Sequence, residues 1–442
     1  MSYYEFTILL YNNVNLYVIS LIVAGIIYFL LYRNKITSLL DPFLMAVFAS
    51  CIGLSVMFFL KLTDNITNFF FYQYILSQIA FTLGFFSNKY DVKTTFTQQI
   101  NINPSLESNY NISKRYYYFF IAISFIFITL QLYTYKVVGI PLFLEYRLAA
   151  VGVGGGFGLI NRFVKTFSIM VIYWALFFFY TKYKRTAIVV LFFYISFTLL
   201  SGSKGAFLIF FQSIFVFLYI NKDLFQKQLY KYNSKAKSLF MIAFVAAIGV
   251  LFITKNNLEE SIQALIFRIV SYGDTYYLAY PNNIINQLTS SDWWVALTGD
   301  LLRTLRLIPE HEALPGMGFE IMEKANHAIN MLAGPNPRHN IFGFVHFGYI
   351  GGLIYSFFCG FIMSYIYKKY YSNDVYILSP LKRMFLFIFY LSVTSIETDP
   401  PSFITVCNNI IIIFMPLFLI ENLFYKYSKK QLNENSGSSS SL

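Results

Sequence analysis

Long runs of apolar residues recur along the chain, separated by shorter polar segments. A helix that crosses a bilayer needs about 20 such residues, because the hydrocarbon core is about 30 Å thick. The sequence holds about eleven such runs, and the period-2 alternation of a membrane strand is missing. The predicted spans are approximately 15–32, 42–60, 69–86, 116–135, 163–181, 186–201, 204–221, 239–254, 341–367, 383–397 and 403–424. We therefore expect an all-α, polytopic integral membrane protein.

The sixth and seventh runs are nearly continuous and are interrupted only by residues 201–205, SGSKG. One helix of about 36 residues would be about 54 Å long, far beyond the thickness of the bilayer. Gly202 and Gly205 instead predict a tight hairpin or a break between two helices. The first run is expected to remain as a helix, because its positive residues Arg33 and Lys35 follow it, whereas a cleavable signal peptide carries them in front.

The composition and the distribution of charge support a membrane protein. Of the 442 residues, 57% are hydrophobic and 12% are charged, against about 25% charged in soluble domains. The net charge is +12, but with the N-terminus outside, 21 of the 33 basic and 7 of the 21 acidic residues fall on inner segments. The inner side then carries +14 and the outer side −2. This asymmetry is typical of membrane topology and not of nucleic-acid binding.

Two outer segments are much longer than passive connections, which predicts that they carry function. Within the second, the amphipathic stretches 259–270 and 296–308 are expected to fold as helices on the membrane surface. The predicted organisation is residues 1–254 with transmembrane helices 1–8 and the outer loop 136–165, residues 255–340 as the large outer loop, residues 341–425 with helices 9–11, and residues 426–442 as an inner tail with a linker-like end.

Cationic side chains gather in these outer segments. Guanidinium groups at a membrane surface suit a diphosphate, which they bind bidentately. Arg303 and Arg306 are spaced to share one helix face. The alternative is that the arginines pair with acidic residues of the loop, such as Asp300, Glu310 and Glu312. The six outer arginines are Arg147, Arg162, Arg268, Arg303, Arg306 and Arg338.

The four histidines, His311, His327, His339 and His346, fall within 36 residues. Their spacing does not match a zinc motif, so we expect no metal. A histidine that is neutral near pH 7 can accept a proton, and His339 is the sharpest candidate because it stands where the ninth span begins. The alternative for each histidine is an exposed or hydrogen-bonded loop residue. Glu397 is either part of a solvated turn or a general base.

Four short motifs together resemble the O-antigen polymerases, the Wzy family of oligosaccharide repeat-unit polymerases. Their order and topology match across most of the chain. At Lys204 the family more commonly has arginine; lysine keeps the charge and loses the bidentate geometry. The motifs are Gly139-Ile140-Pro141-Leu142-Phe143 followed by Arg147, Ser201-Gly202-Ser203-Lys204-Gly205-Ala206, Arg268 followed by Gly273-Asp274, and Asn336-Pro337-Arg338-His339 leading to Gly348-Tyr349-Ile350-Gly351-Gly352.

The resemblance implies a GT-C-like fold and a glycosyltransferase in the bacterial inner (cytoplasmic) membrane, with its N-terminus in the periplasm and its C-terminus in the cytoplasm. Such enzymes transfer a growing glycan from its polyprenyl diphosphate to the non-reducing end of an incoming lipid-linked repeat unit, without metal or other cofactor. Expected partners are the polyprenyl-diphosphate-linked oligosaccharide, membrane lipids, a chain-length-regulating co-polymerase and other envelope polysaccharide assembly proteins. An O-antigen ligase and a lipid-linked oligosaccharide flippase are the alternatives.

The predicted roles follow from this chemistry. Arg147 and Arg268 would stabilise charge on the departing diphosphate, and His339 would accept the proton of the acceptor hydroxyl. The aromatic residues of the large loop would either stack on sugars or anchor the loop at the membrane interface. The predicted substrate-binding residues are Arg162, Lys204, Asp274, Arg303, Arg306 and Arg338, and the aromatic residues are Tyr276, Tyr277, Trp293 and Trp294.

Overall fold

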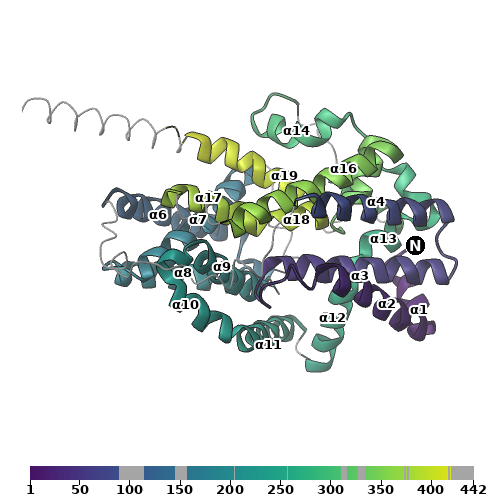
Figure 1. Ribbon diagram of the computed structural model, residues 1–442, viewed down its shortest axis with the longest axis horizontal. Coiled ribbons are helices and arrows are strands. Elements are labelled where there is room, and N and C mark those ends of the chain that lie inside the picture. The colour runs from purple at the N-terminus through teal and green to yellow at the C-terminus, as the bar shows by residue number, and fades with distance from the viewer. Residues whose placement is uncertain are drawn as a thin grey trace, which may run out of the picture.

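The computed structural model describes most of the chain, and every regular element in the described part is a helix. This confirms the all-α prediction for that part. The described residues are 1–88, 114–144, 157–203, 205–255, 257–309, 316–326, 334–372, 375, 378–416 and 419. Figure 1 shows α1–α4, α13 and part of α16 toward one end of an elongated molecule and α6–α9 toward the other.

The elements in chain order are α1 (Tyr3–Asn12), α2 (Val14–Tyr32), α3 (Pro42–Leu62), α4 (Asn68–Ser87), α6 (Lys114–Val138), η2 (Pro141–Phe143), α7 (Phe157–Phe179), α8 (Lys184–Leu200), α9 (Ala206–Ile220), α10 (Lys222–Ser234), α11 (Ala236–Lys255), α12 (Leu258–Val270), η4 (Ser271–Gly273), α13 (Asp274–Ala279), η5 (Pro281–Gln287), α14 (Trp293–Thr304), α15 (Met317–Asn326), α16 (His339–Tyr371), α17 (Pro380–Val393), α18 (Ser395–Thr398), α19 (Pro400–Asn409) and η8 (Ile410–Phe414).

Six helices in the described part are long and apolar enough to cross a membrane: α2, α3, α4, α6, α7 and α16. The pair α10 and α11 passes the same test but is bent by 63°. Shorter helices, α8, α9, α17 and α19, lie on the other predicted spans, and α8 and α9 are separated at the predicted break. The chain is therefore a multi-pass α-helical membrane protein, and the count of eleven spans stays a prediction.

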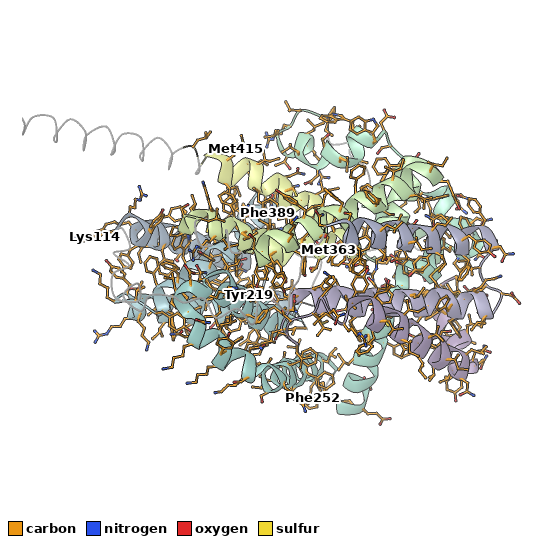
Figure 2. All side chains as sticks on the ribbon, in the orientation of Figure 1. Lys114, Tyr219, Phe252, Met363, Phe389 and Met415 are labelled. Atoms are coloured by element: carbon orange, nitrogen blue, oxygen red, sulfur yellow. The ribbon has the colours of Figure 1, made fainter. Side chains whose placement is uncertain are left out.

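The helices bury large aromatic side chains inside and expose apolar side chains outside. Tyr219 and Met363 are almost inaccessible and lie in the middle of the molecule, whereas Phe252 and Met415 are about half exposed (Figure 2). Apolar side chains along α2, α6 and α11 are also exposed. This distribution is expected of helices whose outer faces contact lipid.

Helices α4 and α16 approach each other until their backbones touch. A Cβ atom on Gly84 would clash with the carbonyl oxygen of Phe357, and one on Gly360 would clash with that of Phe81. Small residues allow this approach, which van der Waals packing between membrane helices requires. The crossing fixes the part of α16 after Gly348 against α4. At Gly348 the backbone is not helical (φ 70°, ψ −169°), and the preceding turns fold back so that Gly343 packs on Gly352 and His339 lies beside Ser356 in the interior.

At the far end of α16, a buried carboxylate joins three helices. Asp41 caps α3 by accepting the backbone N–H of Phe43 at 3.0 Å. The same carboxylate accepts the hydroxyls of Tyr371, at the end of α16, and Tyr390, in α17, at 3.1 and 2.9 Å. Thr37 adds a further hydrogen bond at 3.0 Å. Because the carboxylate is satisfied by several donors, it holds α3, α16 and α17 together, and no cation of the described residues pairs with it.

Replacing either glycine of the α4–α16 crossing should destabilise the protein. We expect Gly84→Ala and Gly360→Ala each to cost about 1–3 kcal/mol, because the new methyl group meets backbone that cannot move aside alone. Thermal unfolding in detergent measures this. Gly25→Ala in α2 is the control, since nothing lies within 4 Å of its Cβ position. Equal melting temperatures for all three variants would contradict the crossing.

Candidate functional site

The most buried of the predicted site residues lie at the start of α16. Pro335 and Pro337 keep the preceding segment extended, and Arg338 is the N-cap residue in an extended conformation. The Arg338 side chain is 4% exposed and His339 is fully buried. A cation with this degree of burial is costly unless its surroundings compensate it, so its neighbours define the candidate site.

A chain of hydrogen bonds determines the state of His339. Tyr28 donates its hydroxyl proton to Gln78 Oε1 at 3.2 Å, so the Gln78 amide group donates to His339 Nε2 at 3.2 Å. His339 Nδ1 is then protonated and donates to Ser356 Oγ at 3.0 Å, and Ser356 donates to the carbonyl of Gly352. The assignment follows from this network. His339 is a neutral imidazole whose lone pair already has a partner.

Arg338 is held by main-chain carbonyls. Its Nη2 atom donates to the carbonyl oxygen of Tyr272 and, at 3.5 Å, to that of Ala49. In the described part of the chain no carboxylate lies within 4.0 Å of the guanidinium. Three carboxyl groups, those of Asp274, Glu397 and Asp399, nevertheless lie within its electrostatic reach. Among the described residues, Arg338 is therefore a buried cation that has carboxyl groups nearby but no direct ion pair.

Asp274 connects this cation to a second predicted arginine. Burial raises the pKa of the Asp274 carboxyl to about 6, although a hydrogen bond from Tyr3 and the charges of Arg338 and Arg268 work in the opposite direction. The Tyr3 hydroxyl and the backbone N–H of Thr275 donate to it at 3.0 and 2.8 Å. The structure thus brings Arg268, Asp274, Arg338 and His339 together, although the sequence separates them by up to 71 positions.

Two acidic residues of the segment 395–399 face the same cation. Glu397 in α18 is buried, and within the described residues its hydrogen-bond partner is the hydroxyl of Ser50. Burial raises the pKa of Asp399, and bonds from Ser402 and the charges of Arg338 and Lys165 partly oppose this effect. Glu397 is consequently not part of a solvated turn, which was one of its two interpretations from sequence.

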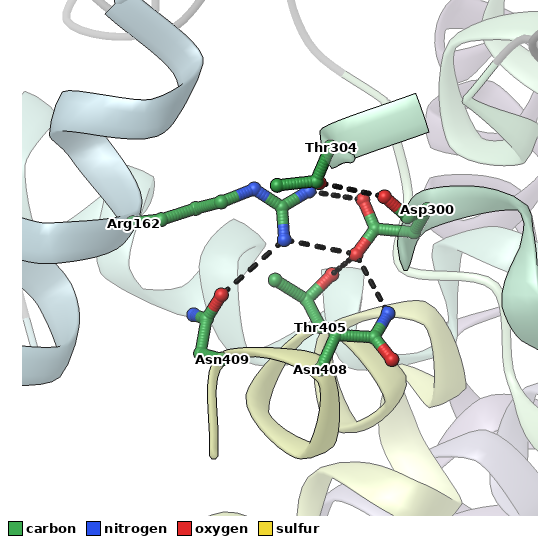
Figure 3. Close-up of polar contacts among 6 residues, drawn as sticks. All are labelled: Arg162, Asp300, Thr304, Thr405, Asn408 and Asn409. Atoms are coloured by element: carbon green, nitrogen blue, oxygen red, sulfur yellow. Dashed lines mark hydrogen bonds and ion pairs between the residues drawn. The ribbon is translucent and has the colours of Figure 1, made fainter. Parts of the chain in front are cut away.

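Arg162 belongs to a different polar cluster, drawn in Figure 3. Its guanidinium forms a bidentate ion pair with Asp300 of α14, with Nη1 3.0 Å from Oδ2, and Nη1 also donates to Asn409 at 3.3 Å. Asn408 and Thr405 of α19 donate to the same carboxylate at 3.0 and 3.3 Å. Burial acts to raise the pKa of Asp300, but these bonds outweigh it and lower the pKa. The acid-pairing alternative is confirmed for Arg162.

Arg303 and Arg306 do not share a helix face, which corrects the spacing argument. Helix α14 ends at Thr304, and Arg306 lies beyond it with a φ of 56°. The backbone N–H groups of Leu307 and Arg306 bond the carbonyls of Leu302 and Arg303 at 2.8 and 3.0 Å. This is a Schellman motif, whose left-handed position is normally glycine. Both arginine side chains are exposed.

The remaining predicted residues divide into three groups. Tyr276 and Tyr277 are core residues, so neither of the two alternatives, stacking on sugars or anchoring at the membrane interface, holds for them; Trp293 and Trp294 are exposed. His346 accepts the backbone N–H of Ser291 at 3.2 Å. Four residues lie outside the described part of the chain, namely Arg147, Lys204, His311 and His327.

The sequence interpretation overlooked the polar residues of α4. Tyr280 donates to Gln73 Oε1 at 2.8 Å, and Asn340 donates to the Tyr280 hydroxyl at 3.0 Å, while Gln78 holds His339. Glutamines inside an apolar run are a signal of functional or packing roles in a membrane, and Gln73 and Gln78 both lie within the predicted span 69–86. They could have been found from the sequence on that ground.

No family model, no curated protein and no solved structure matches this chain.

The raised pKa of Asp274 predicts a pH dependence of stability. The unfolded carboxyl has a pKa near 3.8 and the folded one about 6, so the folded state binds the proton more tightly. Its stabilising contribution is present below pH 4 and is lost as the pH rises through 6, by an amount on the order of 2–3 kcal/mol. Melting temperatures of wild type and Asp274→Asn should diverge between pH 4 and 7, the variant becoming relatively more stable. A difference that stays constant with pH would contradict this.

Proposed function

We propose that this chain is a polysaccharide polymerase of the Wzy type. In this proposal it has about eleven membrane spans in a GT-C-like fold, lies in the bacterial inner membrane and acts on the periplasmic face. It transfers the growing glycan of one polyprenyl-diphosphate-linked oligosaccharide to the non-reducing end of another. It requires no metal or other cofactor and works with a chain-length-regulating co-polymerase and other envelope polysaccharide assembly proteins.

The observation that best supports this proposal is the buried Arg338 at the start of α16. Its bonds to two carbonyls leave its positive charge without a direct carboxylate partner among the described residues. The first turn of α16 adds the partial positive charge of a helix N-terminus, which favours anions. Arg268 contributes a second cation near the same carboxyl group. An anionic leaving group such as a diphosphate suits this arrangement.

The proposed reaction forms one glycosidic bond and breaks the bond between the donor sugar and its diphosphate. The acceptor hydroxyl attacks the anomeric carbon, its proton passes to a protein base, and the lipid diphosphate leaves with the electron pair of the broken bond. Arg338, with Arg268 and Arg147, stabilises the charge that develops on the diphosphate. Arg303, Arg306, Lys204 and Asp274 bind the substrate in this proposal.

Arg162 fits this role least well of the predicted arginines. Its guanidinium is bidentate to Asp300 and also donates to Asn409, so its charge is neutralised and much of its hydrogen-bonding capacity is used. Stabilisation of a leaving diphosphate requires a cation that is not already paired. We assign Arg162 to holding α14 on the bundle, and the direct contacts to substrate remain with the other cations.

Two residues compete for the role of base. His339 is the base that the sequence predicts, but Gln78 occupies its lone pair, so Gln78 must turn aside before His339 accepts a proton. Glu397 has one hydrogen-bond donor, Ser50, among the described residues and lies near the same arginine. A carboxylate with free lone pairs is the simpler acceptor. Because Glu397 has fewer hydrogen-bond donors than a blocked base would have, we propose it as the second candidate for the general base.

Replacing each candidate separates them. His339→Gln and Glu397→Gln remove basicity while keeping hydrogen-bonding capacity, and loss of a general base reduces turnover by about 10²–10⁴-fold. Initial rates of elongation, measured across pH, identify the residue whose replacement removes the acidic limb of the profile. Gln78→Leu is the companion variant: it should raise the rate if His339 is the base and leave it unchanged if Glu397 is. Normal rates in both glutamine variants would rule out both assignments.

Arg306 offers a test that separates charge from stability. An arginine at a left-handed position costs roughly 1–2 kcal/mol relative to a conformation it prefers, and glycine would remove that strain. Arg306→Gly should therefore melt at the same temperature as the wild type or higher, while elongation slows by about tenfold or more because a phosphate contact is lost. Arg306→Lys keeps the charge and serves as the matched control. Full activity in Arg306→Gly would exclude Arg306 from substrate binding.

Reconstitution tests the proposed function as a whole. Purified protein in liposomes receives a synthetic polyprenyl-diphosphate repeat unit, without nucleotide or divalent metal. A ladder of longer lipid-linked glycans supports the polymerase. Transfer of glycan only when lipid A-core is added would identify a ligase, and movement of the intact substrate across the bilayer without a ladder would identify a flippase.

A further inference from the structure

Helix α14 exposes apolar side chains that nothing in the described part of the chain covers. None of its twelve residues is buried. Trp293 is 60% exposed, Trp294 is 53% exposed, and Leu305, at the end of the helix, is 50% exposed. Figure 1 shows α14 at the edge of the molecule, beside α16 and α19. An apolar helix in this position requires an apolar environment outside the chain.

The residues of α14 are divided between two faces. Trp294, Leu301 and Leu305 are spaced by seven and four residues, so they lie on one side of the helix. Arg303 is nine residues after Trp294 and two before Leu305, which places it on the opposite side. A helix with tryptophan and leucine on one face and arginine on the other is typical of a helix that lies in the membrane interface.

The ion pair of Figure 3 fixes α14 against α7 and α19. Asp300 of α14 is bound by Arg162, in the second turn of α7, and by Thr405 and Asn408 of α19. Apolar residues follow these polar positions in both helices, and Ile411 and Met415 after α19 are exposed. The polar latch, defined here as Arg162, Asp300, Thr405, Asn408 and Asn409, therefore holds α14 at the level where α7 and α19 enter the bilayer.

We propose that α14 is an interfacial helix that inserts its Trp294–Leu301–Leu305 face into the boundary between phospholipid headgroups and acyl chains. Twelve residues of helix are about 18 Å long, too short to cross the bilayer. Tryptophan prefers this boundary because its ring is apolar and its indole N–H is polar. Arg303, on the other face, lies among the lipid phosphates. This proposal does not depend on the enzymatic activity.

Lipid explains the observations better than a protein partner does. Helix α14 is bound to α19, and the residues after α19, which lie on a predicted span, expose Ile411 and Met415, so lipid beside this span can also cover α14. The tryptophans alone do not decide between lipid and sugar, but leucines beside them favour acyl chains. A second protein molecule would have to bury the tryptophans away from both water and lipid.

Tryptophan fluorescence tests the placement directly, because the chain contains three tryptophans and the third, Trp174, is buried in α7. Trp174→Phe leaves only the α14 pair. In nanodiscs that contain phosphatidylcholine brominated at positions 6,7, we expect the emission of this variant to fall by about half or more, because an interfacial helix lies about 5–10 Å deep. Bromine at positions 11,12 should quench less, and aqueous iodide least.

The control variant is Trp293→Phe/Trp294→Phe, which retains Trp174 alone and should lack the preference for shallow bromine. If Trp174→Phe does not fold, the difference between wild type and this double variant gives the same signal. Strong quenching by iodide without an effect of brominated lipid would overturn the proposal by placing α14 in water. Protection from every quencher would also overturn it, by placing a protein partner over the tryptophans.

The polar latch should determine the depth of α14 in the membrane interface. Asp300→Asn removes the charge that Arg162 binds and keeps the size of the side chain. If the latch holds α14 at the interface, the ratio of shallow to deep bromine quenching in the Trp174→Phe background should change at least twofold. An unchanged ratio would show that lipid alone positions the helix and would contradict the latch.

Discussion

The contact between the backbones of α4 and α16 is the constraint on which the candidate site depends. Gly84 and Gly360 lie at this crossing, and a methyl group at either position meets main-chain atoms of the other helix. The crossing holds the later part of α16 against α4, and the reversal at Gly348 returns the first turn of α16 to the space between α3, α4, α13 and α18. Gln78 of α4 then reaches His339, and Arg338 reaches the carbonyls of Ala49 and Tyr272.

Arg162 and Arg338 differ in whether a carboxylate is bound directly to the guanidinium. Arg162 is paired with Asp300 and joins α7, α14 and α19, so its charge serves assembly. Arg338 has carboxyl groups within electrostatic reach and none at ion-pair distance in the described part of the chain. A buried ion that lacks a direct partner is costly, and the cost is reduced if an anionic substrate completes the site. This difference separates Arg162, which holds the fold, from Arg338, which we propose as a ligand of the diphosphate.

The apolar pattern predicted the helices well, because a helix in lipid must be apolar along its whole length. In the described part of the chain each predicted span overlaps at least one helix, although only six helices are long enough to cross a membrane. Hydropathy did not predict the bend between α10 and α11 or the positive φ of Gly348 inside α16. The side-chain chemistry was enough to select four site residues from the sequence, namely Arg268, Asp274, Arg338 and His339. Their neighbours were not: Asp300 lies 138 positions from Arg162, and Gln78 lies 261 positions from His339. Long-range contacts of this kind depend on packing, which a local pattern does not contain.

The central claim is that Arg338 belongs to a site for a lipid diphosphate, and ligand-dependent stability measures it most directly. The melting temperature of the protein in detergent is compared with polyprenyl diphosphate, with polyprenyl monophosphate and without ligand. A ligand that binds the folded state stabilises it in proportion to its affinity. We predict a larger upward shift with the diphosphate in wild type and the loss of that difference in Arg338→Gln. Equal shifts with both lipids in wild type, or an unchanged difference in Arg338→Gln, would contradict the claim.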